Sequence, residues 1–167
     1  MNDVNEFLNF VCPRYENLPN VFLYKDQVIE YIEGVLKILV FDEEEKLLTP
    51  TMLNNYVKQH IVSHPKDKKY NKEHLAYLIT VCVFKQVFTL KETCDIVKIQ
   101  IGKYPIDVAY DYFCIELEKA IKSVFATRDF SAKSSATKVT YESEVLRSSV
   151  LAVAHKLFAK RYILKKS

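Results

Sequence analysis

The chain has 167 residues, of which 49% are hydrophobic, and it contains only two glycines and five prolines. This length suits one compact domain or a small head on a helical body, and the hydrophobic content is sufficient for a buried core. All-β folds need many tight turns built from glycine and proline, so the scarcity of both residues favours a mostly α-helical protein.

The net charge of +3 is distributed unevenly along the chain. Residues 1–50 carry a net charge of −6, whereas residues 51–100 and 101–167 carry +4 and +5. A basic segment attracts polyanions, so the asymmetry is consistent with a nucleic-acid partner for the part after residue 50. Solvated helix faces of mixed sign would give the same totals, so charge alone does not decide between the two interpretations.

Neither a membrane protein nor an exported protein is indicated. The sequence has no stretch of roughly 18 or more apolar residues, which a membrane span requires, and its first ten residues, MNDVNEFLNF, have acidic groups where a signal peptide needs positive charge. The cysteines are far apart and form no C-x-x-C motif, which is typical of reduced thiols that act as small buried hydrophobic residues: Cys12, Cys82, Cys94 and Cys114. We therefore expect a cytoplasmic protein without a membrane partner.

The first 48 residues predict two helices. A short helix is expected near residues 4–11, and an irregular segment with Pro13 and Pro19 follows it. From Tyr24 onward, apolar residues recur at helical spacing and predict an amphipathic helix of about four turns; they are Val28, Ile32, Val35, Leu36 and Leu39. The acidic run at residues 42–45 is expected to end this helix as an exposed loop.

A short helix with a polar outer face is predicted directly after residue 48. Thr49 suits the N-cap position, and Pro50 suits the first helical position because its missing N–H has no partner there. One side is apolar, with Met52, Leu53, Tyr56 and Val57, and the other is polar, with Thr51, Asn54, Asn55, Lys58 and Gln59. Side-chain amides can read adenine edges through paired hydrogen bonds, although an ordinary solvated face is the alternative.

A basic connection follows this short helix. Residues 61–62 suggest a short extended piece, residues 63–67 (SHPKD) a turn, and residues 68–70 (KKY) a return strand, which together predict a small β-wing. Lys66, Lys68 and Lys69 in such a wing would hold phosphates. His60 and His64 are four residues apart, but the turn follows at once and no third ligand is evident, so we expect no metal site.

Four more helices are expected in the rest of the chain. Asn71 caps the first, residues 89–92 (TLKE) form a capping box for the second, and Gly102 ends it. Pro105 begins a third, long helix. Residues 128–140 predict a mobile loop, and the last helix is expected from about Tyr141 to Leu164 with a basic tail at residues 156–166.

No motif indicates catalysis or a cofactor. The sequence contains no phosphate-binding glycine loop, no H-E-x-x-H, no G-x-S-x-G and no cysteine–histidine pair placed for nucleophilic attack. We therefore expect neither enzymatic activity nor a bound cofactor. An aromatic group in the third and later helices could line a small-molecule effector site, although an aromatic core is the simpler interpretation; its members are Tyr110, Tyr112, Phe113 and Phe125.

Two resemblances rest on these motifs. Residues 53–65 (LNNYVKQHIVSHP) resemble the second helix and wing of the MerR-like winged helix-turn-helix family, with His60 where that family has glycine. Residues 68–70 resemble the family's return strand, and residues 88–92 (FTLKE) resemble its Phe-Ser-Leu-Glu-Glu helix start. The chain, especially residues 49–88, also resembles an uncharacterised bacterial family, domain of unknown function eighteen thirty-six.

The MerR-like resemblance implies DNA binding by a two-fold dimer, with the short helix in the major groove and the wing on the backbone. We therefore predict a mostly α fold in which a MerR-like winged helix-turn-helix with a small β-wing is embedded in a helical body. The head would span residues 49–102, between an N-terminal helical segment (1–48) and a C-terminal dimerisation or sensor part (103–167). The three parts would form one compact unit.

The leading functional prediction is a transcriptional regulator that binds double-stranded DNA as a homodimer. Thr51, Asn54 and Asn55 would read bases, and Tyr56 would both pack and touch the backbone. The wing and the end of the short helix would hold phosphates through Lys58, Lys66, Lys68 and Lys69, and Tyr70 of the return strand completes the predicted DNA-binding set. The alternative is a non-catalytic protein–protein interaction module that keeps the winged-helix fold. A continuous basic surface would favour DNA, whereas an exposed apolar patch would favour a protein partner.

Overall fold

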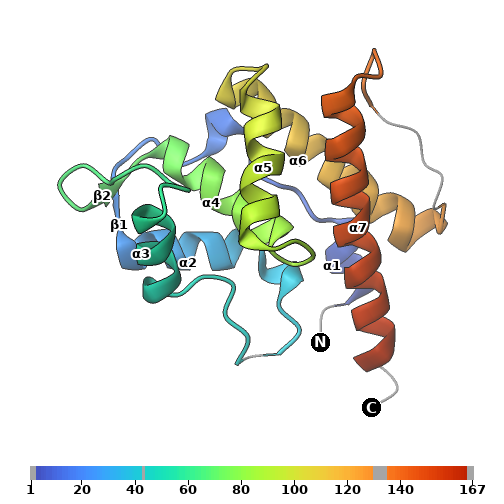
Figure 1. Cartoon of the computed structure of the whole chain (residues 1–167). Coiled ribbons are helices and arrows are strands. Elements are labelled where there is room, and N and C mark those ends of the chain that lie inside the picture. Colours follow the sequence, from blue (N-terminus) through green and yellow to red (C-terminus); the bar gives the residue numbers. More distant parts are fainter. Residues whose placement is uncertain (1–2, 43, 130–134, 165–167) are drawn as a thin grey trace.

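The computed structural model describes residues 3–42, 44–129 and 135–164, and these residues form helices and one small two-stranded sheet (Figure 1). The mostly α-helical fold is therefore confirmed. In chain order the elements are α1 (Val4–Leu8), β1 (Leu23–Tyr24), α2 (Lys25–Val35), α3 (Pro50–Lys58), β2 (Lys69–Tyr70), α4 (Lys72–Phe84), α5 (Leu90–Ile101), α6 (Ile106–Lys122) and α7 (Tyr141–Leu164). Short 3₁₀ turns lie at Tyr15–Asn17 and Lys37–Leu39, and a π-helical turn at Ser123–Thr127 follows α6.

The helices begin where the capping residues predicted. The Thr49 hydroxyl accepts a hydrogen bond from the Met52 N–H at 3.2 Å, and the Asn71 side chain accepts one from the His74 N–H at 3.1 Å. At α5 the Thr89 hydroxyl accepts from the Glu92 N–H at 3.3 Å, and the Glu92 carboxylate accepts in return from the Thr89 N–H at 2.8 Å. These bonds satisfy N–H groups that a helix leaves without partners in its first turn.

Helix α2 is shorter than its apolar spacing predicted. It ends at Val35, and a tighter 3₁₀ turn at Lys37–Leu39 replaces the last predicted turn. Leu36, Ile38 and Leu39 are all buried. The tighter turn lets these three closely spaced side chains enter the core, which one face of an α-helix would not allow.

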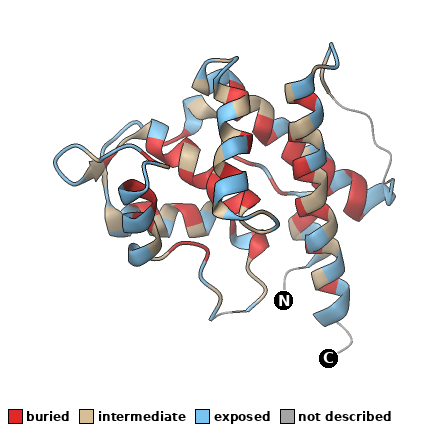
Figure 2. Ribbon diagram, in the orientation of Figure 1, coloured by how far each residue is buried: buried red, intermediate tan, exposed pale blue. Residues whose placement is uncertain are grey.

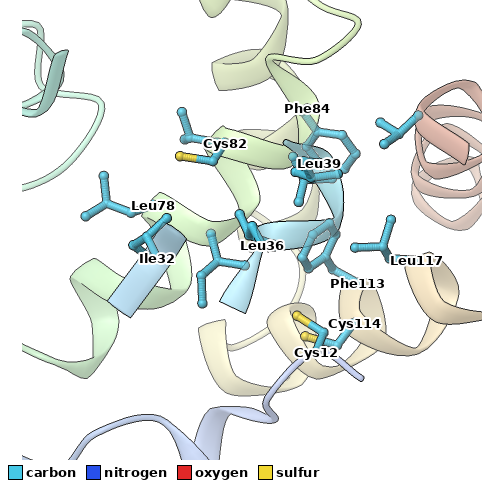
Figure 3. Close-up of a cluster of buried hydrophobic side chains, with 14 of the residues drawn as sticks. Cys12, Ile32, Leu36, Leu39, Leu78, Cys82, Phe84, Phe113, Cys114 and Leu117 are labelled. Carbon is cyan, nitrogen blue, oxygen red and sulfur yellow. The ribbon is translucent and has the colours of Figure 1, made fainter. Parts of the chain in front are cut away.

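One hydrophobic core joins the N-terminal, central and C-terminal parts of the chain. It runs from Phe7 in α1 to Leu157 in α7. Figure 3 shows side chains of α2, α4 and α6 meeting in it, among them Ile32, Leu78 and Phe113. Helix α4 is buried on most sides, and its Phe84 ring meets the Phe113 ring edge to face at a centroid distance of 5.4 Å.

The small sheet differs from the predicted wing. The return strand β2 pairs with β1, through Leu23 with Tyr70 and Tyr24 with Lys69, and not with residues 61–62. The N–H groups of Ile61 and Val62 instead donate to the Tyr56 carbonyl, at 2.9 and 3.4 Å, where they close the end of α3. Because those donors are engaged there, residues 61–62 cannot pair with β2, and the N-terminal segment supplies the partner strand.

Several remaining predictions can be placed. Cys12, Cys82 and Cys114 are buried and unbridged, as expected, whereas Cys94 is half-buried. Within the described ranges, no helix has both the length and the apolar character needed to cross a bilayer. Part of the predicted loop (residues 130–134), one position of the acidic run (43) and the end of the basic tail (165–167) lie outside the described residues.

Candidate nucleic-acid interface

Helix α3 has one buried side and one exposed side, as its sequence predicted. Leu53, Tyr56 and Val57 are buried against the rest of the molecule. The exposed side carries hydroxyl, amide and ammonium groups, from Thr51, Asn54, Asn55 and Lys58. Figure 2 shows this mixture of buried and exposed positions along α3, in contrast to the nearly continuous burial of α4.

Two amide side chains on the exposed side are held by hydrogen bonds. The Lys25 ammonium at the start of α2 donates to the Asn54 side-chain oxygen at 2.7 Å. The Gln59 amide donates to the Asn55 side-chain oxygen at 3.0 Å. Because each bond engages the amide oxygen, both side chains are oriented before any ligand arrives, which lowers the entropy lost on binding.

An open groove of about 860 Å³ lies beside α3. We call it the basic groove; α2 and the preceding β1, α3, and the connection to β2 contribute its lining, which consists of Tyr24, Lys25, Asp26, Asn54, Val57, Lys58, His60, His64, Pro65, Lys68 and Tyr70. Lys25, Lys58 and Lys68 thus approach it from three segments, whereas Asp26 is the acidic residue of the lining. The groove therefore has a net positive lining suited to an anionic ligand.

The connection after α3 is built on left-handed backbone conformations. His60 has a φ of 56°, and Asp67 and Lys68 have φ values of 51° and 63°. His60 stands where the MerR-like pattern has glycine, and its positive φ is the reason that glycine would suit the position. The Lys69 N–H donates to the Lys66 carbonyl at 2.8 Å and closes the turn.

The lysines of this connection are not equivalent. Lys66 and Lys68 are exposed, and Asp67 between them is exposed as well. Lys69 is half-buried, and its ammonium nitrogen lies 5.0 Å from the centroid of the Tyr24 ring. A cation over an aromatic face is already partly stabilised, so Lys69 is less available to a phosphate than Lys66 and Lys68.

Both tyrosines of the predicted interface are buried in the core, so Tyr56 packs as predicted, but neither side chain is exposed for the surface contact predicted for it. Tyr56 is 1% exposed, and its hydroxyl accepts a hydrogen bond from the Lys85 ammonium at 3.0 Å. Tyr70 is 3% exposed, and its ring lies 5.4 Å from the His74 ring, edge to face. Burial raises the pKa of both phenols above the ordinary value, so both remain protonated. Side chains buried in this way support the surface from within.

His74 is a capping residue at the start of α4, and it is buried. Its side chain accepts a hydrogen bond from the Asn71 N–H at 3.0 Å, and its other ring nitrogen lies 3.0 Å from the Ser63 hydroxyl. Burial lowers the pKa of this imidazole, so the neutral form is favoured. His74 therefore ties the start of α4 to the connection that carries Lys66 and Lys68.

Sequence reasoning missed the contribution of the N-terminal segment to this site. Tyr24, Lys25 and Asp26 line the basic groove together with α3, and Lys25 bonds to Asn54 across 29 residues of sequence. No local pattern could reveal these neighbours, because the pairing of β1 with β2 is what brings them together. A weak signal in the sequence indicated the burial of Tyr70: alternate residues of a strand point to opposite sides, so one of Lys69 and Tyr70 faces inward.

The aromatic residues considered for an effector site mostly build the core. Tyr110 and Phe113 line a small cavity of only about 30 Å³, which has room for about two water molecules. The Phe125 ring stacks on the Phe7 ring at a centroid distance of 4.2 Å. An effector site would need several hundred cubic ångströms, so this cavity does not provide one.

Comparison with known proteins gives a family without an assigned activity. A family model described as Domain of unknown function (DUF1836) matches residues 13–113. The match covers the basic groove, all of α2 to α5 and the first part of α6. No curated protein and no solved structure matches the chain.

Proposed function

The chain belongs to the family described as Domain of unknown function (DUF1836), and from the geometry of the basic groove we propose that it is a DNA-binding transcriptional regulator. The observation that carries this proposal is the exposed face of α3, with its hydroxyl, its two oriented amides and the lysines on either side. In the proposed complex α3 enters the major groove, which is about as wide as a helix with its side chains.

The roles divide between affinity and sequence recognition. Lys25, Lys58, Lys66 and Lys68 hold phosphates, which gives affinity without sequence information. Thr51, Asn54 and Asn55 face the base edges, where an amide gives paired hydrogen bonds to adenine. Lys25 is added to the predicted set because it lines the basic groove, and Tyr56 and Tyr70 are left out because they are buried.

The finer part of the proposal concerns the type of fold and the assembly. We place α2 and α3 in the roles of the two helices of a MerR-like helix-turn-helix, which extends the head from the predicted residues 49–102 back to α2, with the turn at residues 63–68 in the role of the wing. The order of a short helix, a basic turn and a capped α5 supports this assignment. A homodimer then presents two α3 helices to successive major grooves, as helix-turn-helix dimers do.

The second candidate function is a protein-interaction module. It is favoured by two apolar side chains directly before β1, since Val21 is 62% exposed and Phe22 is 60% exposed. Exposed neighbouring apolar residues beside a sheet edge suit a protein partner. Phe22→Ser separates the two candidate functions. It leaves every lysine of the basic groove in place, so DNA binding should be kept, whereas it removes the apolar contact, so binding of a protein partner should be weakened.

The test is fluorescence-anisotropy binding of the purified chain to a pool of genomic duplexes across a salt series. Lys66→Ala with Lys68→Ala should weaken binding to all sequences and lower the slope of log K against log salt by roughly 1 to 2, since each phosphate contact contributes about 0.9. Lys119→Ala with Lys122→Ala, an equal loss of charge from two exposed positions of α6, should leave the slope unchanged.

A third variant addresses base reading. Asn54→Ala should weaken a selected duplex by about 1–3 kcal/mol relative to random duplexes, because a paired hydrogen bond to one base is lost. Absence of binding at low salt would refute the regulator proposal and direct attention to the interaction module. If both double lysine variants lowered the slope of log K against log salt equally, the assignment of the basic groove as the contact surface would be refuted.

A further inference from the structure

A second groove, of about 550 Å³, lies between α5 and α7. These helices run side by side (Figure 1) and in opposite directions, because residues at the end of α5 bond to the start of α7. The Gln100 amide donates to the Glu142 carbonyl at 2.9 Å, and the Lys103 ammonium lies 3.0 Å from the Glu142 carboxylate. The two helices therefore form a fixed pair with a groove along their length.

Each helix contributes one regular stripe to this groove. The lining consists of Phe88, Glu92, Asp95, Ile96 and Ile99 from the α5 side and Tyr141, Glu144, Val145, Ser148 and Ser149 from the α7 side. From α5 the positions are spaced by three, one and three residues, which is one face of a helix. The floor is apolar, with Ile96 8% exposed, whereas the Tyr141 ring on the wall is 66% exposed.

The charged groups of the second groove are all acidic. Glu92 and Asp95 stand on the α5 wall and Glu144 on the α7 wall, and among the described residues that line the groove there is no lysine, arginine or histidine. A hydrogen bond from the Thr89 N–H lowers the pKa of Glu92, which keeps this carboxylate ionised. On the same helix, Lys98 lines a different groove, beside α4, and Lys91 is exposed. We call the α5–α7 site the acidic groove.

We propose that the acidic groove docks a basic amphipathic helix of a protein partner. The apolar floor takes the partner's anchors at positions i, i+3 or i+4, and i+7, which is the usual mode of helix-in-groove recognition. The carboxylates on both walls face lysine or arginine side chains that flank those anchors. The same carboxylates repel phosphate, so this groove and the basic groove select ligands of opposite charge.

The length of the acidic groove sets the length of the segment it holds. Within α5 the lining runs from Glu92 to Ile99, which is roughly 10 Å at the rise of an α-helix and corresponds to about two turns of a partner helix. A segment of this length carries three apolar anchors on one face. The exposed Tyr141 ring at one end of the groove then becomes a buried contact, and large aromatic rings are typical of the energetic centre of an interface.

The proposal can be tested with designed peptides and the full chain. The probe is an amphipathic peptide of about four helical turns with leucine anchors flanked by lysines, and its control has glutamates in place of the lysines. Binding is measured by fluorescence anisotropy, and amide shift changes in ¹⁵N spectra locate the contact. We expect saturable one-to-one binding of the lysine peptide only, with shift changes confined to α5 and α7.

Two variants and a matched control make the result specific. Asp95→Lys with Glu144→Lys should weaken the lysine peptide at least about fivefold, because two attractive pairs become repulsive. Tyr141→Ser should weaken it as well, and both variants leave the core intact because Asp95, Glu144 and Tyr141 are exposed. Glu30→Lys, a charge reversal at an exposed position of α2, should leave the peptide's dissociation constant unchanged.

The contrary outcomes are equally definite. Equal binding of both peptides, shift changes outside α5 and α7, or equal weakening by Glu30→Lys would overturn the proposal. Sedimentation of the full chain gives a further outcome: a dimer that dissociates in the double charge-reversal variant would show that a second copy covers this groove, and the proposal would be wrong. None of these results depends on DNA binding, so the two proposals can fail separately.

Discussion

Helices α3 and α4 follow one another in the chain but differ in almost every physical property. Helix α3 is nine residues long, and its exposed side carries hydroxyl, amide and ammonium groups. Helix α4 is thirteen residues long, and nine of them are buried. Under the proposed function, α4 therefore supplies stability and the exposed side of α3 supplies recognition. Side chains on the exposed side of α3 can change with little cost in stability, whereas the buried side chains of α4 cannot.

The largest expected effect is a loss of stability from α4. Leu78 is fully buried in the core, and Leu78→Ala removes apolar contacts and leaves a cavity, so we expect a loss of about 2–5 kcal/mol of unfolding free energy. Asn55→Ala on the exposed side of α3 should change it by about 0.5 kcal/mol or less. Urea unfolding followed by circular dichroism measures both. Similar losses in the two variants would remove the distinction between the helices.

A smaller effect is expected where α3 itself enters the core. Tyr56→Phe removes the hydroxyl that accepts the Lys85 hydrogen bond and should cost about 1 kcal/mol of stability. Affinity for duplex DNA should not change, because the ring is buried and the lysines of the basic groove are untouched. A loss of affinity for DNA without a loss of stability would indicate that the Tyr56 hydroxyl contacts DNA.

The connection after α3 should gain stability from glycine. His60 holds a φ of 56°, a conformation that costs a residue with a Cβ about 1–2 kcal/mol, and the greater flexibility of glycine in the unfolded chain offsets part of the gain. His60→Gly should therefore stabilise the protein by about 0.5–1 kcal/mol in thermal unfolding. His64→Gly, which is also exposed but is outside the left-handed region, serves as the control and should give no gain.

The smallest expected effect is a dependence of stability on pH through His74. Burial lowers the pKa of this imidazole in the folded state, so the unfolded chain binds a proton more readily. The stabilising contribution is therefore complete above the unfolded pKa of about 6.5 and is lost as pH falls through the folded value. The midpoint of thermal unfolding should decrease between neutral and mildly acidic pH, and His74→Gln should reduce that decrease.

The two grooves extend the comparison from helices to surfaces. The basic groove is lined by lysines, oriented amides and exposed turns, whereas the acidic groove is an apolar floor between carboxylates. Each is carried by elements whose other faces are packed in the same core. Surfaces of opposite charge on one body would allow the two proposed ligands, DNA and a basic partner helix, to be held at once.

Local chemistry in the sequence determined the elements of this protein. Thr49, Asn71 and Thr89 each begin a helix, because a side-chain oxygen satisfies the first N–H groups wherever such a residue precedes an apolar repeat. The bounds of α7 agree with those expected from the sequence, and the apolar and polar sides of α3 predicted which side faces solvent. These features depend on neighbours within about four residues, which a sequence shows directly.

Tertiary structure alone decided how the candidate site is assembled. The pairing of Leu23 with Tyr70 joins residues 47 positions apart in the sequence. Because β2 pairs with β1 and not with residues 61–62, Tyr70 is buried and Lys25 lies next to Asn54. No residue next to β2 in the sequence determines which segment becomes its partner strand. A strand pairs with a segment whose backbone N–H and carbonyl groups are still unpaired and lie beside a buried face. Only the packing of the whole chain determines which segment that is.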